Sequence, residues 1–73
     1  MQCNVKEFRM NINNIKTMRE LNIILDDGYE SYSYLDDEFL PVYELRYRQK
    51  LVNSFSSFES LVFHVRKKGL YKF

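Results

Sequence analysis

Hydrophobic and polar positions near the C-terminus follow the spacing of an amphipathic helix. Four apolar residues fall at positions i, i+3, i+4 and i+7: Phe58, Leu61, Val62 and Val65. Ser56 and Glu59 have the spacing of a capping box, in which each side chain bonds the other residue's backbone amide. Gly69 is a typical residue to end a helix. The pattern predicts a helix over about residues 57–68.

Residues 17–27 have a weaker helical pattern. A capping box of the Thr-x-x-Glu form begins at Thr17, and apolar residues follow at helical spacing. A β-hairpin is the alternative, because apolar residues also alternate over 21–25 and Asp27-Gly28 is typical of a tight turn. We prefer the helix, which would end at Gly28.

Four further segments have the character of strands. Residues 43–48 alternate between apolar and charged side chains just after Pro41, which is typical of a half-buried strand. Residues 8–13 alternate in the same way. Residues 29–35, rich in Tyr and Ser, are a third candidate, and residues 70–73 are a short fourth.

The predicted order is strand, helix, strand, strand, helix, strand, which indicates the α+β class. We expect a small antiparallel sheet with one or two helices on one face. Residues 13–28 and 53–69 are loose counterparts at an offset of about 40, so a ferredoxin-like βαββαβ arrangement is one form of this fold. The other form is a three- or four-stranded meander that carries only the C-terminal helix.

Composition indicates a single small domain over residues 1–73. Hydrophobic residues make up 45% of the chain and aromatic residues 16%, which is too apolar for a disordered segment. The core of so short a chain is marginal, and a homodimer would bury more surface. We see neither a signal-peptide core nor an apolar run near the roughly 18 residues of a membrane span, so we expect a cytoplasmic protein.

The chain offers few residues from which an active site could be built. Cys3 is the single cysteine, which excludes an intrachain disulfide and favours a reducing compartment. Cys3 and His64 are a nucleophile and a base by type, but no catalytic motif surrounds either residue. Neither a metal-ligand spacing nor a glycine-rich phosphate loop is present. We therefore expect a protein without catalytic activity, metal or cofactor.

Charge is divided unevenly along the chain. Residues 1–40 hold four basic and eight acidic side chains, a net charge of −4, whereas residues 41–73 hold seven basic and two acidic ones, a net charge of +5. Such asymmetry is typical of proteins with charged partners. Residues 26–38, which we call the acidic tyrosine-rich segment, contain six acids, three tyrosines and no base.

The acidic tyrosine-rich segment is the first candidate site, for a partner protein with a basic surface. Carboxylates along a turn and a strand can present negative charge as a nucleic-acid backbone does, and tyrosines are enriched where binding energy concentrates. Opposite fields also speed association. The candidate residues are Asp26, Asp27, Glu30, Tyr32, Tyr34, Asp36, Asp37 and Glu38. The alternative is a solvated acidic loop that keeps the protein soluble.

The C-terminal half offers a second candidate site, for nucleic acid, because phosphate binding begins with clusters of basic side chains. The candidate residues are Arg46, Arg48, Lys50, Arg66, Lys67 and Lys68. Those in the predicted C-terminal helix also have a structural explanation, since cations are favourable in the last turn of a helix.

Two apolar residues lie off the buried faces of the predicted helices and suggest a third hypothesis. Ile23 and Phe63 could join copies of the chain in a homo-oligomer. The alternative for Phe63 is to pack under residues 70–73.

Composition also bears on origin and completes the functional hypothesis. The chain lacks Ala and Trp and has two Gly and one Pro, a bias that indicates an AT-rich genome such as that of a phage or another mobile element. We therefore predict a small non-enzymatic protein-binding domain that inhibits or modulates a host protein. A nucleic-acid-binding or defence protein is the kind of target that the acidic tyrosine-rich segment suits.

Overall fold

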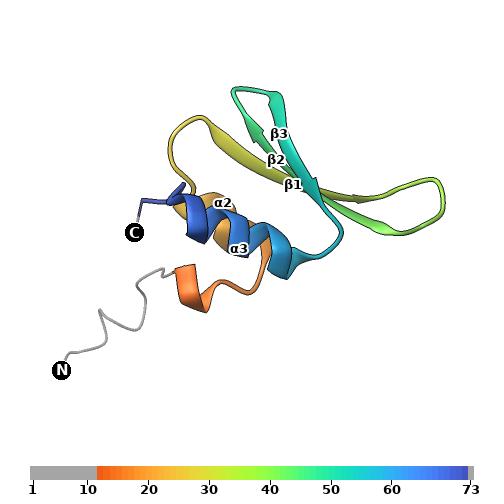
Figure 1. Ribbon diagram of the computed structural model, residues 1–73, viewed down its shortest axis with the longest axis horizontal. Helices are drawn as coiled ribbons and strands as arrows, with labels where there is room; N and C mark the ends of the chain where they lie inside the picture. Colours follow the sequence, from red (N-terminus) through yellow and green to blue (C-terminus); the bar gives the residue numbers. More distant parts are fainter. Residues whose placement is uncertain (1–11, 73) are drawn as a thin grey trace.

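The computed structural model describes residues 12–72. Its elements are η1 (Ile12–Asn14, a 3-10 helix), α2 (Met18–Ile24), β1 (Tyr29–Leu35), β2 (Pro41–Tyr47), β3 (Lys50–Phe55) and α3 (Phe58–Lys68). The strands form an antiparallel sheet in the order β1-β2-β3, so consecutive strands are neighbours (Figure 1). The α+β class is confirmed. The ferredoxin-like order is wrong, because a three-stranded meander runs without interruption between the two helices.

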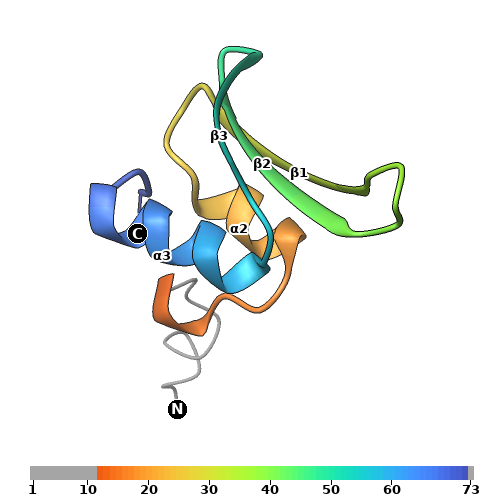
Figure 2. The ribbon, with the colours of Figure 1, turned by 45° about the vertical axis from the view of Figure 1, so that its right-hand side comes forward.

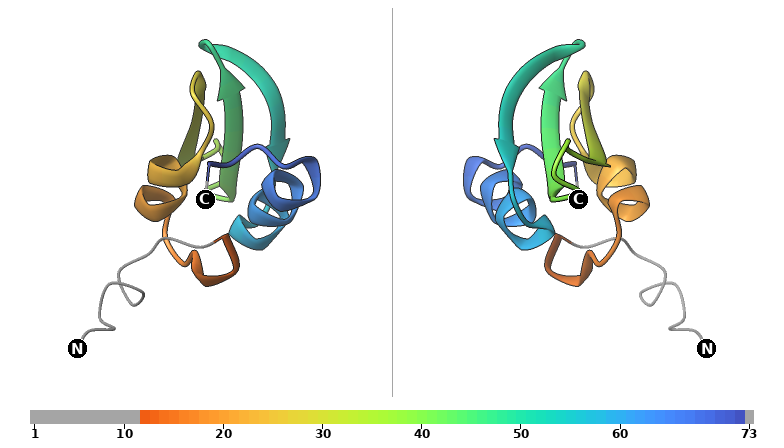
Figure 3. Two further views of the ribbon diagram at one scale, coloured as in Figure 1. Left: turned by 90° about the vertical axis from the view of Figure 1, so that its left-hand side faces the viewer. Right: turned by 90° about the vertical axis from the view of Figure 1, so that its right-hand side faces the viewer.

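The helices cover only part of the sheet. Both lie on the same side of it and leave the loop between β1 and β2 extending away from the rest of the molecule (Figures 1 and 2). The buried core lies where the helices meet the middle strand, and it consists of Ile12, Leu21, Ile24, Leu25, Leu45, Leu61 and Val65. Seen along the sheet, α2 lies on the β1 side and α3 on the β3 side (Figure 3).

The preferred helix at residues 17–27 is confirmed as α2, although it ends earlier. The capping box forms: the Glu20 amide donates to Thr17 Oγ1 (3.1 Å), and the Thr17 amide donates to Glu20 Oε1 (3.0 Å). The helix ends at Ile24, because the C-terminal segment takes over the backbone bonding beyond it. The Lys72 amide donates to the Ile24 carbonyl (2.7 Å), and the Asp26 amide donates to the Leu70 carbonyl (3.0 Å).

The predicted C-terminal helix is confirmed as α3, with a different N-cap. Ser57 caps the helix, and its hydroxyl accepts from the Ser60 amide (3.1 Å). The predicted pair of Ser56 and Glu59 is therefore wrong by one residue. Gly69 ends the helix as expected, in the left-handed conformation at φ 68°.

The strand predictions have mixed outcomes. Residues 29–35 form β1 as predicted, and β2 covers most of the predicted strand at 43–48. It ends at Tyr47 because Arg48 and Gln49, both at positive φ, make a two-residue hairpin turn to β3. Of the strand expected at 70–73, residues 70–72 form a single bridge, between Tyr71 and Leu25, and residue 73 lies outside the described residues.

Two of the strand assignments need correction. The strand expected at residues 8–13 is wrong where the structure describes it, because Ile12 and Asn13 belong to η1, and residues 8–11 lie outside the described residues. The strand β3 was not predicted. Its apolar residues Leu51 and Val52 are adjacent rather than alternating, and the pairing register with β2 shifts beside them, between Leu45 and Arg46.

Candidate protein-binding surface

The structure divides the acidic tyrosine-rich segment into three parts. Asp26 and Asp27 precede β1, and Asp36, Asp37 and Glu38 follow it in the loop to β2. A strand of seven residues separates the two groups by roughly 20 Å, at about 3.3 Å per residue. Asp27 also pairs with Lys72 (3.4 Å). The predicted residues therefore do not form one continuous acidic patch.

The middle part is a row of side chains on the outer face of β1. Alternation along the strand places Glu30, Tyr32 and Tyr34 on the face opposite the buried Ser31. Their cross-strand neighbours on β2 include Glu44 and Arg46, since Tyr32 pairs with Glu44 and Glu30 pairs with Arg46. This outer row is the part of the predicted site that carries its tyrosines.

Hydrogen bonds hold the outer row in place. The Tyr34 hydroxyl donates to Glu44 Oε2 (2.6 Å), and Arg46 Nε donates to Glu44 Oε1 (2.9 Å). The Arg46 guanidinium lies 5.5 Å from the centre of the Tyr32 ring. The Tyr32 hydroxyl donates to Glu30 Oε1 (2.8 Å). The two tyrosines are thus oriented before any partner binds.

These contacts also set the charges of the outer row. Glu44 is only 8% exposed, and the bonds from Tyr34 and Arg46 lower the pKa of its carboxyl. The same bond raises the pKa of Tyr34, and the bond to Glu30 raises the pKa of Tyr32. Glu44 is therefore ionised and balances Arg46, so this face presents neutral aromatic rings without an excess of positive charge.

The third part is the end of the β1–β2 hairpin, which consists of the last residue of β1 and the loop to β2 (residues 35–40) and which we call the hairpin tip. The Asp36 carboxylate closes it: Asp36 Oδ1 accepts from the amides of Glu38 (2.8 Å) and Leu40 (3.0 Å). The backbone closes it a second time, since the Asp36 amide donates to the Leu40 carbonyl (3.0 Å) and the Phe39 amide donates to the Asp36 carbonyl (2.9 Å). The hairpin tip is therefore an ordered turn.

The hairpin tip carries large apolar side chains that are exposed to solvent. Phe39 is 79% exposed, and Leu35 and Leu40 are 60% and 55% exposed. Phe39 also has φ 63°, a left-handed conformation that costs a residue with a side chain roughly 1–3 kcal/mol. Sequence reasoning stopped at Glu38 and missed Phe39 and Leu40. The available signal was a pair of apolar residues placed directly between an acidic turn and Pro41.

The predicted basic residues lie in separate places. Arg46 is bound to Glu44, and Arg48 lies in the β2–β3 turn with its guanidinium 5.3 Å from the Tyr47 ring. Lys50 begins β3 beside that turn. The last turn of α3 holds the others, Arg66, Lys67 and Lys68. The β2–β3 turn lies away from the end of α3 (Figures 1 and 3), so these six residues do not share one surface.

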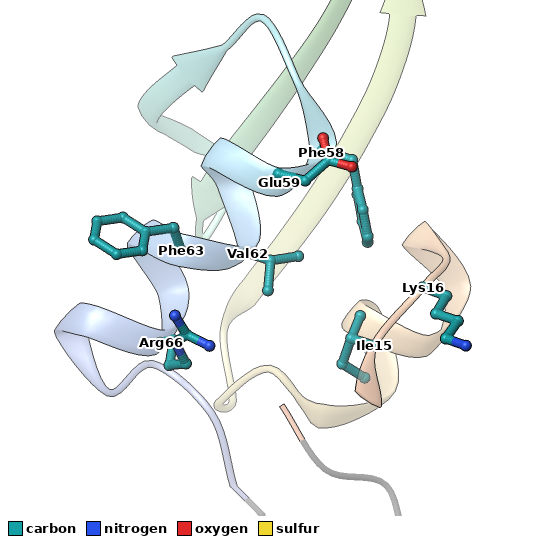
Figure 4. A pocket seen from close by; sticks show the side chains of 7 residues that line it. All are labelled: Ile15, Lys16, Phe58, Glu59, Val62, Phe63 and Arg66. Carbon is teal, nitrogen blue, oxygen red and sulfur yellow. The ribbon is translucent and has the colours of Figure 1, made fainter. Parts of the chain in front are cut away.

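A second apolar feature lies on α3, where Phe63 is 55% exposed. Residues 70–72 therefore do not cover it. Hollows of about 510 and 430 Å³ lie on either side of this ring. In the larger one, Phe58 and Val62 point from α3 toward Ile15, while Phe63 projects away from them (Figure 4). Ile23, on α2, is 51% exposed.

Few groups in the described part of the chain suit catalysis or metal binding. His64 is half-buried, with its ring centre 5.3 Å from that of Phe55. Cys3 lies outside residues 12–72, so the pair with His64 stays a sequence-based consideration. Among the described residues, no three His, Cys, Asp or Glu side chains are grouped as metal ligands. None of the helices described is long and apolar enough to cross a membrane.

Comparison with known proteins adds no relative. Neither a family model, nor a curated protein, nor a solved structure is significantly similar to this chain.

Proposed function

We propose that this protein is a small non-enzymatic binding domain whose hairpin tip and outer row contact a basic surface on a partner protein. The observation that carries the proposal is the exposure of an aromatic side chain at the hairpin tip. Phe39 is held at a strained backbone angle with 79% of its surface exposed, beside the acids Asp37 and Glu38. No packing within residues 12–72 accounts for an aromatic residue in that position.

The hairpin tip has the physical properties of a binding loop. Aromatic anchors surrounded by polar groups supply most of the binding energy in protein interfaces. The loop is closed by Asp36 before binding, so little conformational entropy is lost when Phe39 inserts into a pocket. Acidic side chains beside an anchor favour a basic partner and speed the encounter. The oriented tyrosines of β1 extend the same surface along the hairpin.

The composition of the chain suggests the biological setting. The absence of Ala and Trp and the few Gly and Pro residues indicate an AT-rich gene, as is common in phages and other mobile elements. We propose that the partner is a host protein with a basic surface, such as a nucleic-acid-binding or defence protein, which the domain inhibits or modulates.

The test compares which proteins the wild type and two tip variants retain from a lysate of the host cells. Phe39→Ser removes the anchor, and the double variant Asp37→Asn/Glu38→Gln removes charge while leaving Asp36 to close the loop. Phe63→Ser is the matched control, because Phe63 is an exposed aromatic residue away from the tip. A true partner should lose about tenfold or more of its affinity for the Phe39→Ser variant, since a hot-spot residue contributes more than about 1.4 kcal/mol.

The charge variant should slow association and weaken its dependence on salt. A partner retained equally by the wild type and both tip variants would contradict the proposal. Salt-sensitive binding to short DNA or RNA duplexes, lost when Arg48, Lys67 and Lys68 are changed to Ala, would instead favour a nucleic-acid-binding domain.

A further inference from the structure

Within residues 12–72, two exposed phenylalanines lie in surroundings of opposite charge. The first is Phe39 at the hairpin tip, among Asp36, Asp37 and Glu38. The second is Phe63 on α3, and we call the surface around it the Phe63 surface. It consists of the two hollows on either side of that ring, and both hollows include Phe63 and Glu59.

The Phe63 surface is apolar at its floor and basic at its rim. Its floor is formed by Ile15, Phe55, Phe58 and Val62, and the exposed Phe63 ring separates the two hollows. Its rim carries four cations and one acid, namely Lys16, Arg66, Lys67, Lys68 and Glu59. The Arg66 guanidinium lies 5.9 Å from the centre of the Phe63 ring. Cations outnumber acids here, which is the opposite of the hairpin tip.

We propose that the hairpin tip of one copy docks on the Phe63 surface of a second copy, so that the chain associates head to tail. Phe39 would enter a hollow beside Phe63, and Asp37 and Glu38 would lie against the cations of the rim. The two hollows, of about 510 and 430 Å³, are open to solvent, so a side chain of another copy can enter them from outside. The inference shares the tip with the proposed function and specifies a second copy as its occupant.

Charge favours this arrangement over contact between two hairpin tips, which would bring the acids of the two copies together. Like charges across an interface cost several kcal/mol in general, whereas the tip and the Phe63 surface are complementary.

The fold favours contact between copies rather than within one. The hairpin tip extends away from the helices, whereas the Phe63 surface lies on α3, which is one of those helices (Figures 1 and 2). A head-to-tail contact leaves one tip and one Phe63 surface unoccupied, so assemblies grow, either closing into a ring or continuing as a filament. An occupied tip cannot bind another protein, and self-association therefore competes with partner binding.

The experiment is sedimentation velocity of the full chain over a series of concentrations. We expect the average mass to rise with concentration. The apparent dissociation constant should increase about tenfold or more between about 0.1 M and about 1 M NaCl, because the Debye length falls from about 10 Å to about 3 Å.

Two variants identify the contact. The tip variant carries Phe39→Ser, Asp37→Asn and Glu38→Gln, and the surface variant carries Lys67→Glu and Lys68→Glu. Each alone should remain a monomer. A 1:1 mixture should form a heterodimer and nothing larger, because the intact tip of one variant meets the intact Phe63 surface of the other. Circular dichroism checks folding, and Phe63→Ser serves as a second surface variant without a charge change.

Several outcomes would overturn the inference. They are a wild type that stays monomeric at every concentration, assembly that survives in the tip variant, and mixed variants that remain monomers. Assembly that depends on Phe63 but not on Phe39 would point to a symmetric contact instead. None of these results bears on capture of a host protein, where loss with Phe39→Ser and retention with Phe63→Ser would still support the proposed function.

Discussion

The part of the sheet beneath the helices and the part beyond them use apolar residues in opposite ways. Beneath the helices, Leu45 of the middle strand is completely buried against Leu61 and its neighbours. Beyond them, Leu35 and Phe39 at the end of the same hairpin are mostly exposed. The strands are continuous from one part to the other. One hairpin thus supplies Leu45 to the core and, at its other end, a surface that the core does not need.

This difference separates the residues that fold the chain from those available for binding. A small domain buries little surface and is marginally stable, so the core residues under the helices tolerate few substitutions. The hairpin tip is ordered locally by Asp36 and by the β1–β2 pairing. It can therefore hold exposed apolar residues in place without help from the core.

The largest expected difference between the two parts is in their tolerance of truncation. Leu61→Ala should lower the free energy of unfolding by about 2–5 kcal/mol, because it leaves a cavity in the centre of the core. Leu40→Ala, at the tip, should change it by less than about 0.5 kcal/mol, since its side chain is already exposed. Urea denaturation of both variants measures the contrast. Similar losses in the two variants would show that the tip packs more tightly than its exposure indicates.

A smaller effect is expected at the boundary between the two parts. Asn22 of α2 binds the free edge of β1: its Oδ1 accepts from the Ser31 amide (2.7 Å), and its Nδ2 donates to the Ser31 carbonyl (3.2 Å). Asn22→Ala should cost about 1–3 kcal/mol of unfolding free energy, because the buried Ser31 loses its partners. Asn14→Ala, at an exposed position, is the control. Equal stability of the two variants would contradict this role of Asn22.

The smallest effect is expected at the outer row, whose contacts should make stability depend on pH. The pKa of Glu44 is lowered, so its bonds stabilise the fold above the ordinary glutamate value of about 4.3 and are lost as pH falls through the lowered value. The pKa of Tyr34 is raised, so its stabilisation is present below about 10 and is lost as pH rises through the raised value. Urea midpoints measured across pH should therefore fall at both extremes.

Two variants assign this pH dependence. Glu44→Gln should reduce the loss of stability in acid, leaving the part due to Glu20, whose pKa is also lowered. Tyr34→Phe should reduce the alkaline loss, leaving the part due to Tyr32. An acid limb that Glu44→Gln does not change would place the dependence on other carboxyls.

Local signals were enough to locate both helices and two of the three strands. Thr17 and Glu20 form the capping box that their spacing predicts, because a cap depends on residues within one turn. Leu21 and Leu61, matched at an offset of about 40, are both completely buried. β3 was missed because its apolar residues do not alternate, and the bulge that accommodates them exists only in the pairing with β2.

Only part of the candidate site could be predicted, because its contacts also depend on the pairing of strands. The acids and tyrosines of residues 26–38 could be found by counting charges and rings along the chain. Which of them act together depends on neighbours that are distant in sequence. Arg46 was assigned to a basic surface, yet it bonds Glu44, two residues before it on the same face of β2. It also lies against Tyr32, which the pairing of β1 with β2 brings to the same place.

By itself, the sequence determined the fold class, both helices and the separation of charge along the chain. Caps, periodicity and composition are local properties, which do not depend on contacts between residues that are distant in sequence. Tertiary structure alone decided that three strands follow one another in a single sheet, and that α2 and α3 cover only one part of it. It therefore also decided that Phe39 and Phe63 remain exposed, because exposure is set by what the rest of the chain leaves uncovered.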